Sequence, residues 1–188
     1  MNARRGSLAF MPSFGTASAQ RLLTVHPDLR LLMETVVARH DCAVLCGRRG
    51  KAEQDEAVRT GASRTVWPQS KHNVPCKACA GSGRKPNVPG SVCPICTGTG
   101  EQPAGLSMAV DAAPYFGDEL PHVNWNTGDK EILKRWHAWG GYVLGTADML
   151  FAAGRITHEV RWGGDWDGDW KHNDQTLHDL PHFELQEP

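Results

Sequence analysis

The chain has 188 residues, 40% of them apolar, which is enough for one packed domain and a small appendage. Its formal charge of −1 and pI near 6.7 argue against a nucleic-acid-binding protein, because such proteins usually carry a basic surplus. No run approaches the roughly 18 apolar residues of a membrane helix, and the apolar stretch Leu8–Met11 is too short for a secretory signal. We therefore expect a monomer made in the cytoplasm, with no signal peptide and no membrane insertion.

The first 72 residues predict a tail, three helices and one strand. Pro27 suits the first turn of a helix, and the apolar residues after it recur at helical spacing. A short apolar run closed by Gly47 is typical of a buried strand. The expected elements are a flexible tail over residues 1–14, helices over Ser18–Leu23, Pro27–His40 and Lys51–Thr60, and a strand over Asp41–Gly47.

The part of the chain after residue 105 predicts a second set of elements. Gly140 and Gly141 lie inside the longest helical pattern, which indicates a kink or a close packing contact there. The expected elements are strands over Leu106–Ala112, Ile156–Trp162 and His182–Leu185, a helix over Gly128–Ala153, and a polar loop over Gly163–His178. This order predicts an α+β domain that is interrupted by residues 73–105.

Residues 73–105 differ in character, because Gly, Pro and Cys dominate them. Two C-x-x-C-x-G-x-G repeats supply Cys76, Cys79, Cys93 and Cys96. Two such turns can complete a tetrahedral four-thiolate zinc site, and the glycines give the turns backbone freedom. Such a site has no open position, so we expect a structural zinc that supplies folding energy. Two disulfides or free thiols are the alternative.

The repeat resembles half of the cysteine-rich zinc region of J-domain co-chaperones. The likeness covers only about 25 residues and implies a zinc knuckle rather than chaperone activity. A role as a nucleic-acid or protein adaptor is disfavoured, since the segment has few basic residues and no stacking aromatics.

Three further motifs flank this segment. They are Ser70-Lys71-His72, then Ser107 to Asp111, then Asp179-Leu180-Pro181-His182. In this order they resemble zinc D-alanyl-D-alanine carboxypeptidases and phage L-alanyl-D-glutamate endopeptidases, with Ser107 where that family usually has glycine. The resemblance runs from about Phe14 to Leu185 outside the insert. It implies a small antiparallel sheet with helices packed on it, as in Hedgehog domains, and a peptidase domain made of residues 15–72 and 106–188.

The resemblance implies that His72, Asp111 and His182 hold a catalytic zinc and that Asp179 activates a water. The residue types fit this chemistry independently. A catalytic zinc usually has three His or carboxylate ligands and one open position. A nearby carboxylate can accept a proton from water and pass it to the leaving amine. With the thiolate site, we expect two Zn²⁺ ions per chain.

Other candidates surround this constellation. The family's G-x-R-[ST] turn implies that Arg49 contacts the substrate or the oxyanion, but glycine replaces the hydroxyl residue here, so Arg48 stays open as an alternative. Gln54 is expected to support the fold. Ser70, Trp162 and Trp166 are expected to contact substrate, although an ordinary surface serine is an equal alternative for Ser70, and packing is one for Trp166.

Two other patterns favour ordinary explanations. Cys42 and Cys46 lie in an apolar strand pattern, so we expect buried structural thiols. The alternating Asp165, Asp167 and Asp169 suggest a calcium loop, but glycine falls at the fourth position instead of the sixth that an EF-hand needs.

The sequence therefore favours a phage endolysin that is made in the host cytoplasm and cuts the L-Ala–D-Glu bond of bacterial peptidoglycan after release. A D-Ala-D-Ala carboxypeptidase is the alternative enzyme. A non-catalytic zinc protein on the same fold, binding the wall or a partner, is the alternative outside enzymes. The presence of Asp179 argues against this last class.

Overall fold

The computed structural model describes residues 12–116, 123–171, 174 and 176–186. The helices are α1 (Thr16–Leu22), α2 (Pro27–Val37), α3 (Lys51–Arg59), the short 3₁₀ turn η1 (Lys77–Cys79) and α4 (Lys130–Ala152). The strands are β1 (Cys42–Cys46), β2 (Ala109–Pro114), β3 (Val160–Trp162) and β4 (His182–Leu185). Within this described part, no helix is both long and apolar enough to cross a membrane.

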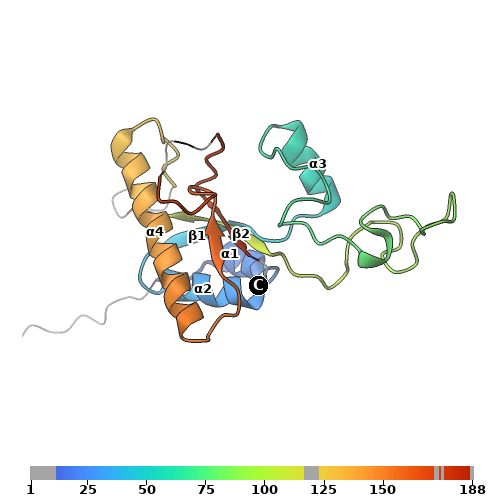
Figure 1. Ribbon diagram of the computed structural model, residues 1–188, viewed down its shortest axis with the longest axis horizontal. Helices are drawn as coiled ribbons and strands as arrows, with labels where there is room; N and C mark the ends of the chain where they lie inside the picture. The colour runs from blue at the N-terminus through green and yellow to red at the C-terminus, as the bar shows by residue number, and fades with distance from the viewer. Residues whose placement is uncertain (1–11, 117–122, 172–173, 175, 187–188) are drawn as a thin grey trace, which may run out of the picture.

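The four strands form one sheet in the order β1-β2-β4-β3, and every neighbouring pair is antiparallel (Figure 1). The expected α+β architecture with a small antiparallel sheet is therefore confirmed. The outer edge of β1 is covered by α1, where the Ser18 hydroxyl accepts a hydrogen bond from the Val44 amide and Arg21 donates to the Val44 carbonyl. These side chains satisfy an edge that would otherwise be open to pairing with another chain.

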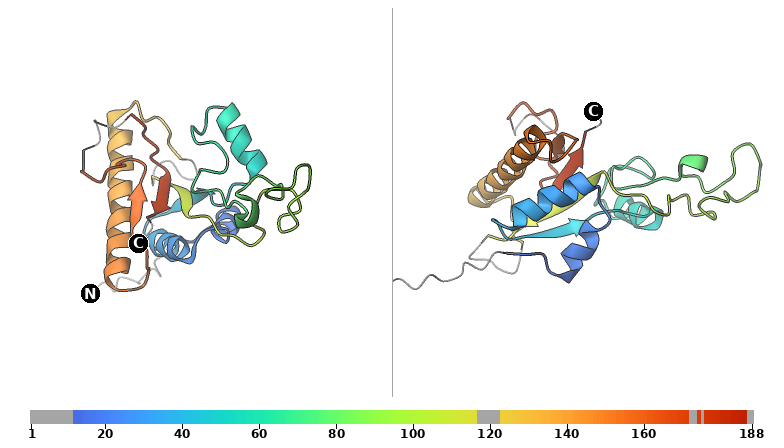
Figure 2. Two further views of the ribbon diagram at one scale, coloured as in Figure 1. Left: turned by 45° about the vertical axis from the view of Figure 1, so that its right-hand side comes forward. Right: turned by 90° about the horizontal axis from the view of Figure 1, so that it is seen from below.

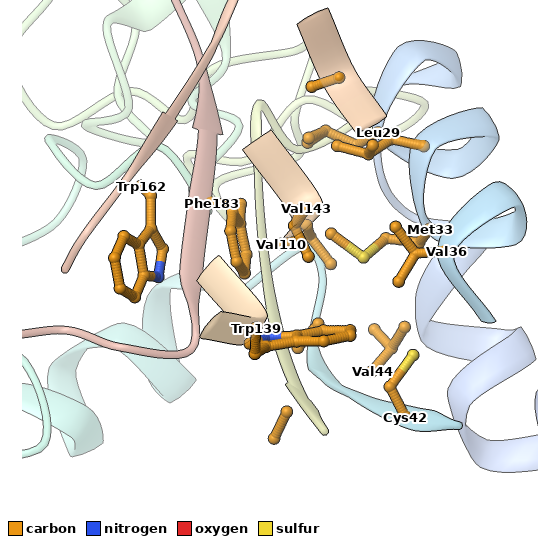
Figure 3. Close-up of a cluster of buried hydrophobic side chains, with 14 of the residues drawn as sticks. Leu29, Met33, Val36, Cys42, Val44, Val110, Trp139, Val143, Trp162 and Phe183 are labelled. Carbon is orange, nitrogen blue, oxygen red and sulfur yellow. The ribbon is translucent and has the colours of Figure 1, made fainter. Parts of the chain in front are cut away.

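Helices α2 and α4 contact each other and cover one face of the sheet. Pro27 opens α2, and the Asp129 side chain caps α4 by accepting from the amides of Glu131 and Ile132. Figure 3 shows apolar side chains of both helices packed against those of the strands, and Met33, Val143 and Phe183 are fully buried. This packing is the main core of the described chain.

The alternation of side chains along each strand separates this core from a polar face. On β4, Phe183 and Leu185 join the core, whereas His182 and Glu184 point to the opposite side. Asp111 on β2 is the direct cross-strand partner of His182. The opposite face of the same small sheet is thus available for a polar site.

Several boundaries differ from the sequence prediction. Strand β2 spans Ala109–Pro114 instead of Leu106–Ala112, and α2 ends at Val37 instead of His40. Strand β3 begins at Val160 instead of Ile156, because the Asp28 carboxylate accepts hydrogen bonds from the amides of Thr157 and His158 and holds this stretch as a loop. The predicted tail, residues 1–14, lies mostly outside the described residues, but Phe14 packs half-buried against the core.

Residues 73–105 project away from the sheet and from α4 (Figures 1 and 2). None of the residues described in the main core comes from this segment. Its base is fixed by Glu101, whose carboxylate accepts from the Lys51 amide at 2.9 Å and pairs with Arg48 at 3.2 Å. The Trp67 indole also donates to the Gly81 carbonyl at 3.0 Å.

Candidate metal centre and its cleft

Three side chains that are far apart in the sequence converge on the polar face of the sheet. His72 Nε2 lies 3.0 Å from Asp111 Oδ1 and 3.2 Å from His182 Nδ1. His182 Nδ1 lies 3.0 Å from Asp111 Oδ1. Asp111 and His182 reach this point as cross-strand neighbours, and His72 reaches it from the loop before the insert.

The opposite ring nitrogen of each histidine is already engaged. His72 Nδ1 lies 2.7 Å from the Gly47 carbonyl oxygen, which can only accept, so Nδ1 carries the proton. His182 Nε2 lies 3.0 Å from Glu184 Oε2 and donates to that carboxylate. In the neutral rings, both contacts leave the converging nitrogens as acceptors, which is the tautomer that a metal ligand needs.

The geometry fits one small divalent cation. Zinc binds imidazole nitrogen and carboxylate oxygen at about 2.0–2.2 Å, so tetrahedral ligands stand about 3.3 Å apart. The three separations here, 3.0 to 3.2 Å, are close to that value. Two imidazoles and one carboxylate leave a fourth position open toward the cleft.

The electrostatics of the cluster also favour a cation. Burial opposes the charge on Asp111, yet the two imidazoles outweigh it and hold the pKa of that carboxyl well below its usual range. Burial likewise opposes protonation of the histidines, but Asp111 raises the pKa of His72 to about 10 and that of His182 to about 9. Without metal, the cluster attracts positive charge in the form of protons.

Glu184 holds the His182 ring in position through the hydrogen bond to Nε2. Burial opposes its charge, but hydrogen bonds from His182 and Arg161 lower the pKa of Glu184 to about 2. Arg161 is the cross-strand partner of Glu184, and its guanidinium lies 5.3 Å from the centre of the Trp166 ring. Neither Glu184 nor Arg161 was singled out from the sequence, although Glu184 shares a face with His182 by strand alternation.

Asp179 lies at the edge of the cluster. Its backbone is fixed, because its amide donates to the Gly163 carbonyl at 2.9 Å and its carbonyl accepts from the His182 amide at 3.0 Å. Burial raises the pKa of Asp179, and the charge of nearby Asp111 adds to this effect. A carboxyl with a raised pKa is a stronger base once ionised.

The two arginines of the turn after β1 have different surroundings. Arg49 Nη2 lies 3.5 Å from Asp111 Oδ2, whereas Arg48 pairs with Glu101 at the base of the insert. Gln54 is fully buried and accepts from Arg49 Nη1 at 3.2 Å. Asn73, which the sequence did not single out, donates to the Arg49 carbonyl at 3.0 Å. The structure therefore brings Arg49, and not Arg48, to the candidate metal centre.

Cys46 lies beside the cluster, which the apolar strand pattern did not indicate. The register shifts between Val44 and Cys46, so that Cys46 pairs with Asp111. This bulge turns the thiol from the core face to the polar face. Its sulfur lies within 4.8 Å of ligand atoms of His72 and Asp111, and 3.6 Å from Arg49 Nη2. Cys42, by contrast, is buried in the core as expected.

The remaining candidates fall into two groups. The Ser70 hydroxyl accepts from the His72 amide at 3.3 Å and lines the cleft, and Trp166 lies with its ring centre 5.5 Å from that of His182. The expectation that Trp162 contacts substrate is wrong, because this residue is only 2% exposed, stacks on Phe183 and donates to the Leu180 carbonyl. Trp162 supports the segment before His182 from the core and is not a wall of the cleft.

A cleft of about 820 Å³ opens over the cluster. It brings together His72, Asp111 and His182 with Asp179. The cations on its walls are Arg49, Arg64, Lys71 and Arg161. A second cavity of about 670 Å³ adjoins it and shares Trp125, His178, Asp179 and Pro181. Asp179 thus lines both the cleft and the second cavity.

The four insert cysteines form a separate cluster. Their sulfur atoms lie within 4.8 Å of one another, all four side chains are buried, and none is in a disulfide. Cys79 Sγ and Cys96 Sγ are 3.7 Å apart, and tetrahedral thiolates at about 2.3 Å from zinc stand about 3.8 Å apart. The donor set and spacing therefore fit a zinc ion.

The two repeats have matching backbones. The residue after each C-x-x-C, Ala80 or Thr97, has a positive φ. A Cβ at Gly83 would lie 2.2 Å from the Gly98 carbonyl oxygen, and one at Gly100 would lie 2.2 Å from the Gly81 carbonyl oxygen. Glycine is required at both positions, which explains the repeated spacing in the sequence.

Ligand atoms of Asp165, Asp167 and Asp169 lie within 4.8 Å of one another, but both oxygens of Asp165 are engaged within the loop. Asp165 Oδ1 accepts from the Gly168 amide and Oδ2 accepts from the Trp170 amide. The carboxylate therefore shapes the turn itself.

No protein-family model and no curated protein sequence matches the chain. Among solved structures, it is similar to the crystal structure of Serratia marcescens L-Ala D-Glu endopeptidase ChiX. The identity is 24%, the alignment covers 93% of this chain and 91% of that chain, and the TM-score is 0.50. At this identity, the likeness shows a shared fold.

Proposed function

We propose that this chain is a zinc-dependent peptidase that cuts the L-Ala–D-Glu bond of peptidoglycan stem peptides. The observation that carries the proposal is the convergence of His72 Nε2, Asp111 Oδ1 and His182 Nδ1 within 3.2 Å, on the floor of a cleft that Asp179 also lines. The shared fold with an L-Ala D-Glu endopeptidase supports the choice of substrate.

The residues around the cluster have distinct roles in this proposal. A zinc ion held by His72, Asp111 and His182 would supply Lewis acidity toward the scissile carbonyl and the attacking water. Asp179 accepts the proton of that water and returns it to the leaving amine. Its raised pKa suits both steps, because the protonated carboxyl must also act as an acid.

Arg49 and the walls of the cleft hold the substrate in this proposal. Arg49 pairs with Asp111 Oδ2 and lines the cleft, so its guanidinium can hold the substrate carbonyl or a carboxylate while it fixes a metal ligand. The cationic walls of the cleft suit a stem peptide, whose D-Glu residue carries a carboxylate. Ser70 and Trp166 complete the walls on which the peptide would lie.

The insert has a structural role in the proposal. Cys76, Cys79, Cys93 and Cys96 hold a second zinc, which stabilises a segment without apolar residues in the main core. Burial opposes the thiolate, but the amides of Gly100 and Gly98 lower the pKa of Cys96 to about 7, which favours a metal-binding thiolate. In a phage, the protein would be made in the host cytoplasm and act on the wall after release.

Digestion of purified peptidoglycan, followed by mass spectrometry of the released ends, tests the bond. New N-terminal D-Glu supports the endopeptidase, whereas released D-Ala would replace it with a D-Ala-D-Ala carboxypeptidase. Asp167→Ala, which removes an exposed carboxylate of the neighbouring loop, is a matched control for Asp179→Ala. Absence of any cleavage by the zinc-loaded protein would leave a non-catalytic binding protein as the better explanation.

A further inference from the structure

The second cavity beside Asp179 has no role in the chemistry described above. It has a volume of about 670 Å³, and its lining differs from that of the cationic cleft. Trp125, Leu133 and Leu180 give it an apolar surface, and Thr127 and His178 add polar groups. Because it shares Trp125, His178 and Asp179 with the cleft, a bound molecule can extend past Asp179 from one compartment into the other.

Trp125 forms an exposed aromatic platform in this cavity. This residue is 54% exposed, although its ring centre lies only 5.3 Å from that of Trp136, at an angle of 33°. Trp136 is fully buried, so one side of the Trp125 ring rests on the core and the rest remains accessible. The accessible part of the ring lines the cavity, where it can contact a bound molecule.

The backbone around Trp125 is fixed before any ligand binds. The Trp136 indole donates to the Asn124 carbonyl at 3.0 Å, and the Asn124 side chain accepts from the Asn126 amide at 2.9 Å. The Thr127 amide donates to the Trp125 carbonyl at 2.8 Å. A ligand therefore loses little affinity to ordering of this segment.

This combination of an aromatic plate and a polar rim is suited to a pyranose ring. One face of such a sugar presents C–H groups, which pack on an indole, and its edge presents hydroxyl and acetamido groups, which need hydrogen-bond partners. Thr127 and His178 can supply such partners at the rim of the cavity. The peptide side of the cleft instead carries Arg49, Arg64 and Lys71.

We propose that the cavity at Trp125 is a saccharide subsite, which holds the N-acetylmuramic acid residue that carries the stem peptide. The inference rests on the proposed function and extends it from the peptide to the glycan. The sugar ring stacks on Trp125, and Thr127 and His178 bind its polar edge.

The position of the cavity fits the L-Ala–D-Glu bond. In peptidoglycan, L-Ala is joined directly to the lactyl group of the sugar, so the sugar begins one residue from this bond. The D-Ala–D-Ala bond lies three residues further along the stem, which adds about 10 Å in an extended chain. A saccharide subsite that begins at Asp179 therefore favours the endopeptidase over the carboxypeptidase.

The test compares a disaccharide-linked stem peptide with the same peptide N-acetylated and free of sugar. For the zinc-loaded parent, kcat/KM should be about two- to tenfold higher on the sugar-linked substrate, the range expected for one aromatic stack. Trp125→Ala should reduce this ratio to near one, and Trp125→Phe should restore most of it. Trp170→Ala removes another exposed tryptophan, 74% exposed and outside both cavities, and should leave the ratio unchanged.

Equal cleavage of both substrates by the parent would overturn the subsite while leaving the peptidase intact. A ratio in Trp125→Ala equal to that of the parent would do the same. If neither substrate is cut, the proposed function fails. Titration of tryptophan fluorescence with the disaccharide then still decides the subsite: saturable binding that Trp125→Ala abolishes supports it, and no binding overturns it.

Discussion

Glu184→Ala tests whether the cluster under the cleft is a metal centre. The substitution removes the acceptor of the His182 Nε2–H hydrogen bond, 3.0 Å long, in a position only 5% exposed. A hydrogen bond to a charged group contributes about 1.5–3 kcal/mol, and each 1.4 kcal/mol corresponds to about a tenfold change in affinity. We therefore expect zinc to bind about 10- to 100-fold more weakly, the usual range for a carboxylate that orients a ligand histidine.

The assay is a competition titration with a chromogenic chelator at fixed pH. It is best done in a Cys76→Ser background, so that only the His72 site is measured. Glu184→Gln keeps an acceptor for His182 without the charge and should lose less affinity than Glu184→Ala. Glu131→Ala, which removes a carboxylate whose side chain is 74% exposed and paired with Lys134, should lose none.

A folded Glu184→Ala variant with the zinc affinity of the parent would refute this reasoning. Circular dichroism separates that outcome from simple unfolding. Arg161, the other partner of Glu184, has a side chain that is 38% exposed and can be hydrated when the carboxylate is removed. The loss should therefore appear mainly in the metal affinity and less in the stability.

Three other predictions concern packing, pH and the insert. Gly140→Ala should destabilise the fold by about 1–3 kcal/mol, because its Cβ would lie 2.4 Å from buried Trp162. At Gly141 an added Cβ would have nothing within 4 Å, so Gly141→Ala should stabilise α4 by up to about 1 kcal/mol. Equal melting temperatures of the two variants would contradict this prediction. Burial opposes the charge on Asp28, but hydrogen bonds from the loop before β3 outweigh it and lower the pKa, so its stabilisation is present above the unfolded pKa and lost as pH falls through the folded one. Asp28→Asn should cost about 1–3 kcal/mol in urea unfolding at pH 7, and a difference that persists undiminished at low pH would contradict the assignment. Cys76→Ser should lose one of two zinc ions by elemental analysis, and an unchanged content of two would exclude the four-thiolate site.

The elements of the fold were largely predictable because their signals are local. The apolar spacing after Pro27 and the run before Gly47 depend only on neighbouring residues, and α2 and β1 follow them closely. Strand β3 was predicted too long, because the carboxylate that holds its first residues as a loop belongs to Asp28, on a distant helix. The residues next to β3 in the sequence give no indication of that contact.

The candidate metal ligands were identified from motif order, not from proximity. His72 is 39 positions from Asp111, and Asp111 is 71 positions from His182. The structure brings all three together. It also brings in Cys46, which the sequence could not indicate, because a bulge rather than the strand period turns its thiol toward them.

The roles of the tryptophan side chains could not be predicted from the sequence. Trp162 and Trp166 are only four positions apart, but Trp162 ends β3 on its buried face, whereas Trp166 lies in the following loop beside the cleft. Trp125 has no motif around it and reaches the cavity only because α4 supplies Trp136 as its support. Side-chain roles of this kind depend on tertiary contacts, and composition does not determine them.

The central claim is that one metal site and one carboxylate together hydrolyse the stem peptide. The most direct measurement follows cleavage of peptidoglycan by the metal-free protein, the zinc-loaded protein and zinc-loaded Asp179→Asn. We expect no cleavage without metal, full cleavage with zinc, and a loss of about 10²- to 10⁴-fold in Asp179→Asn at unchanged zinc content. Cleavage by the metal-free protein, or by Asp179→Asn at the rate of the parent, would contradict the account.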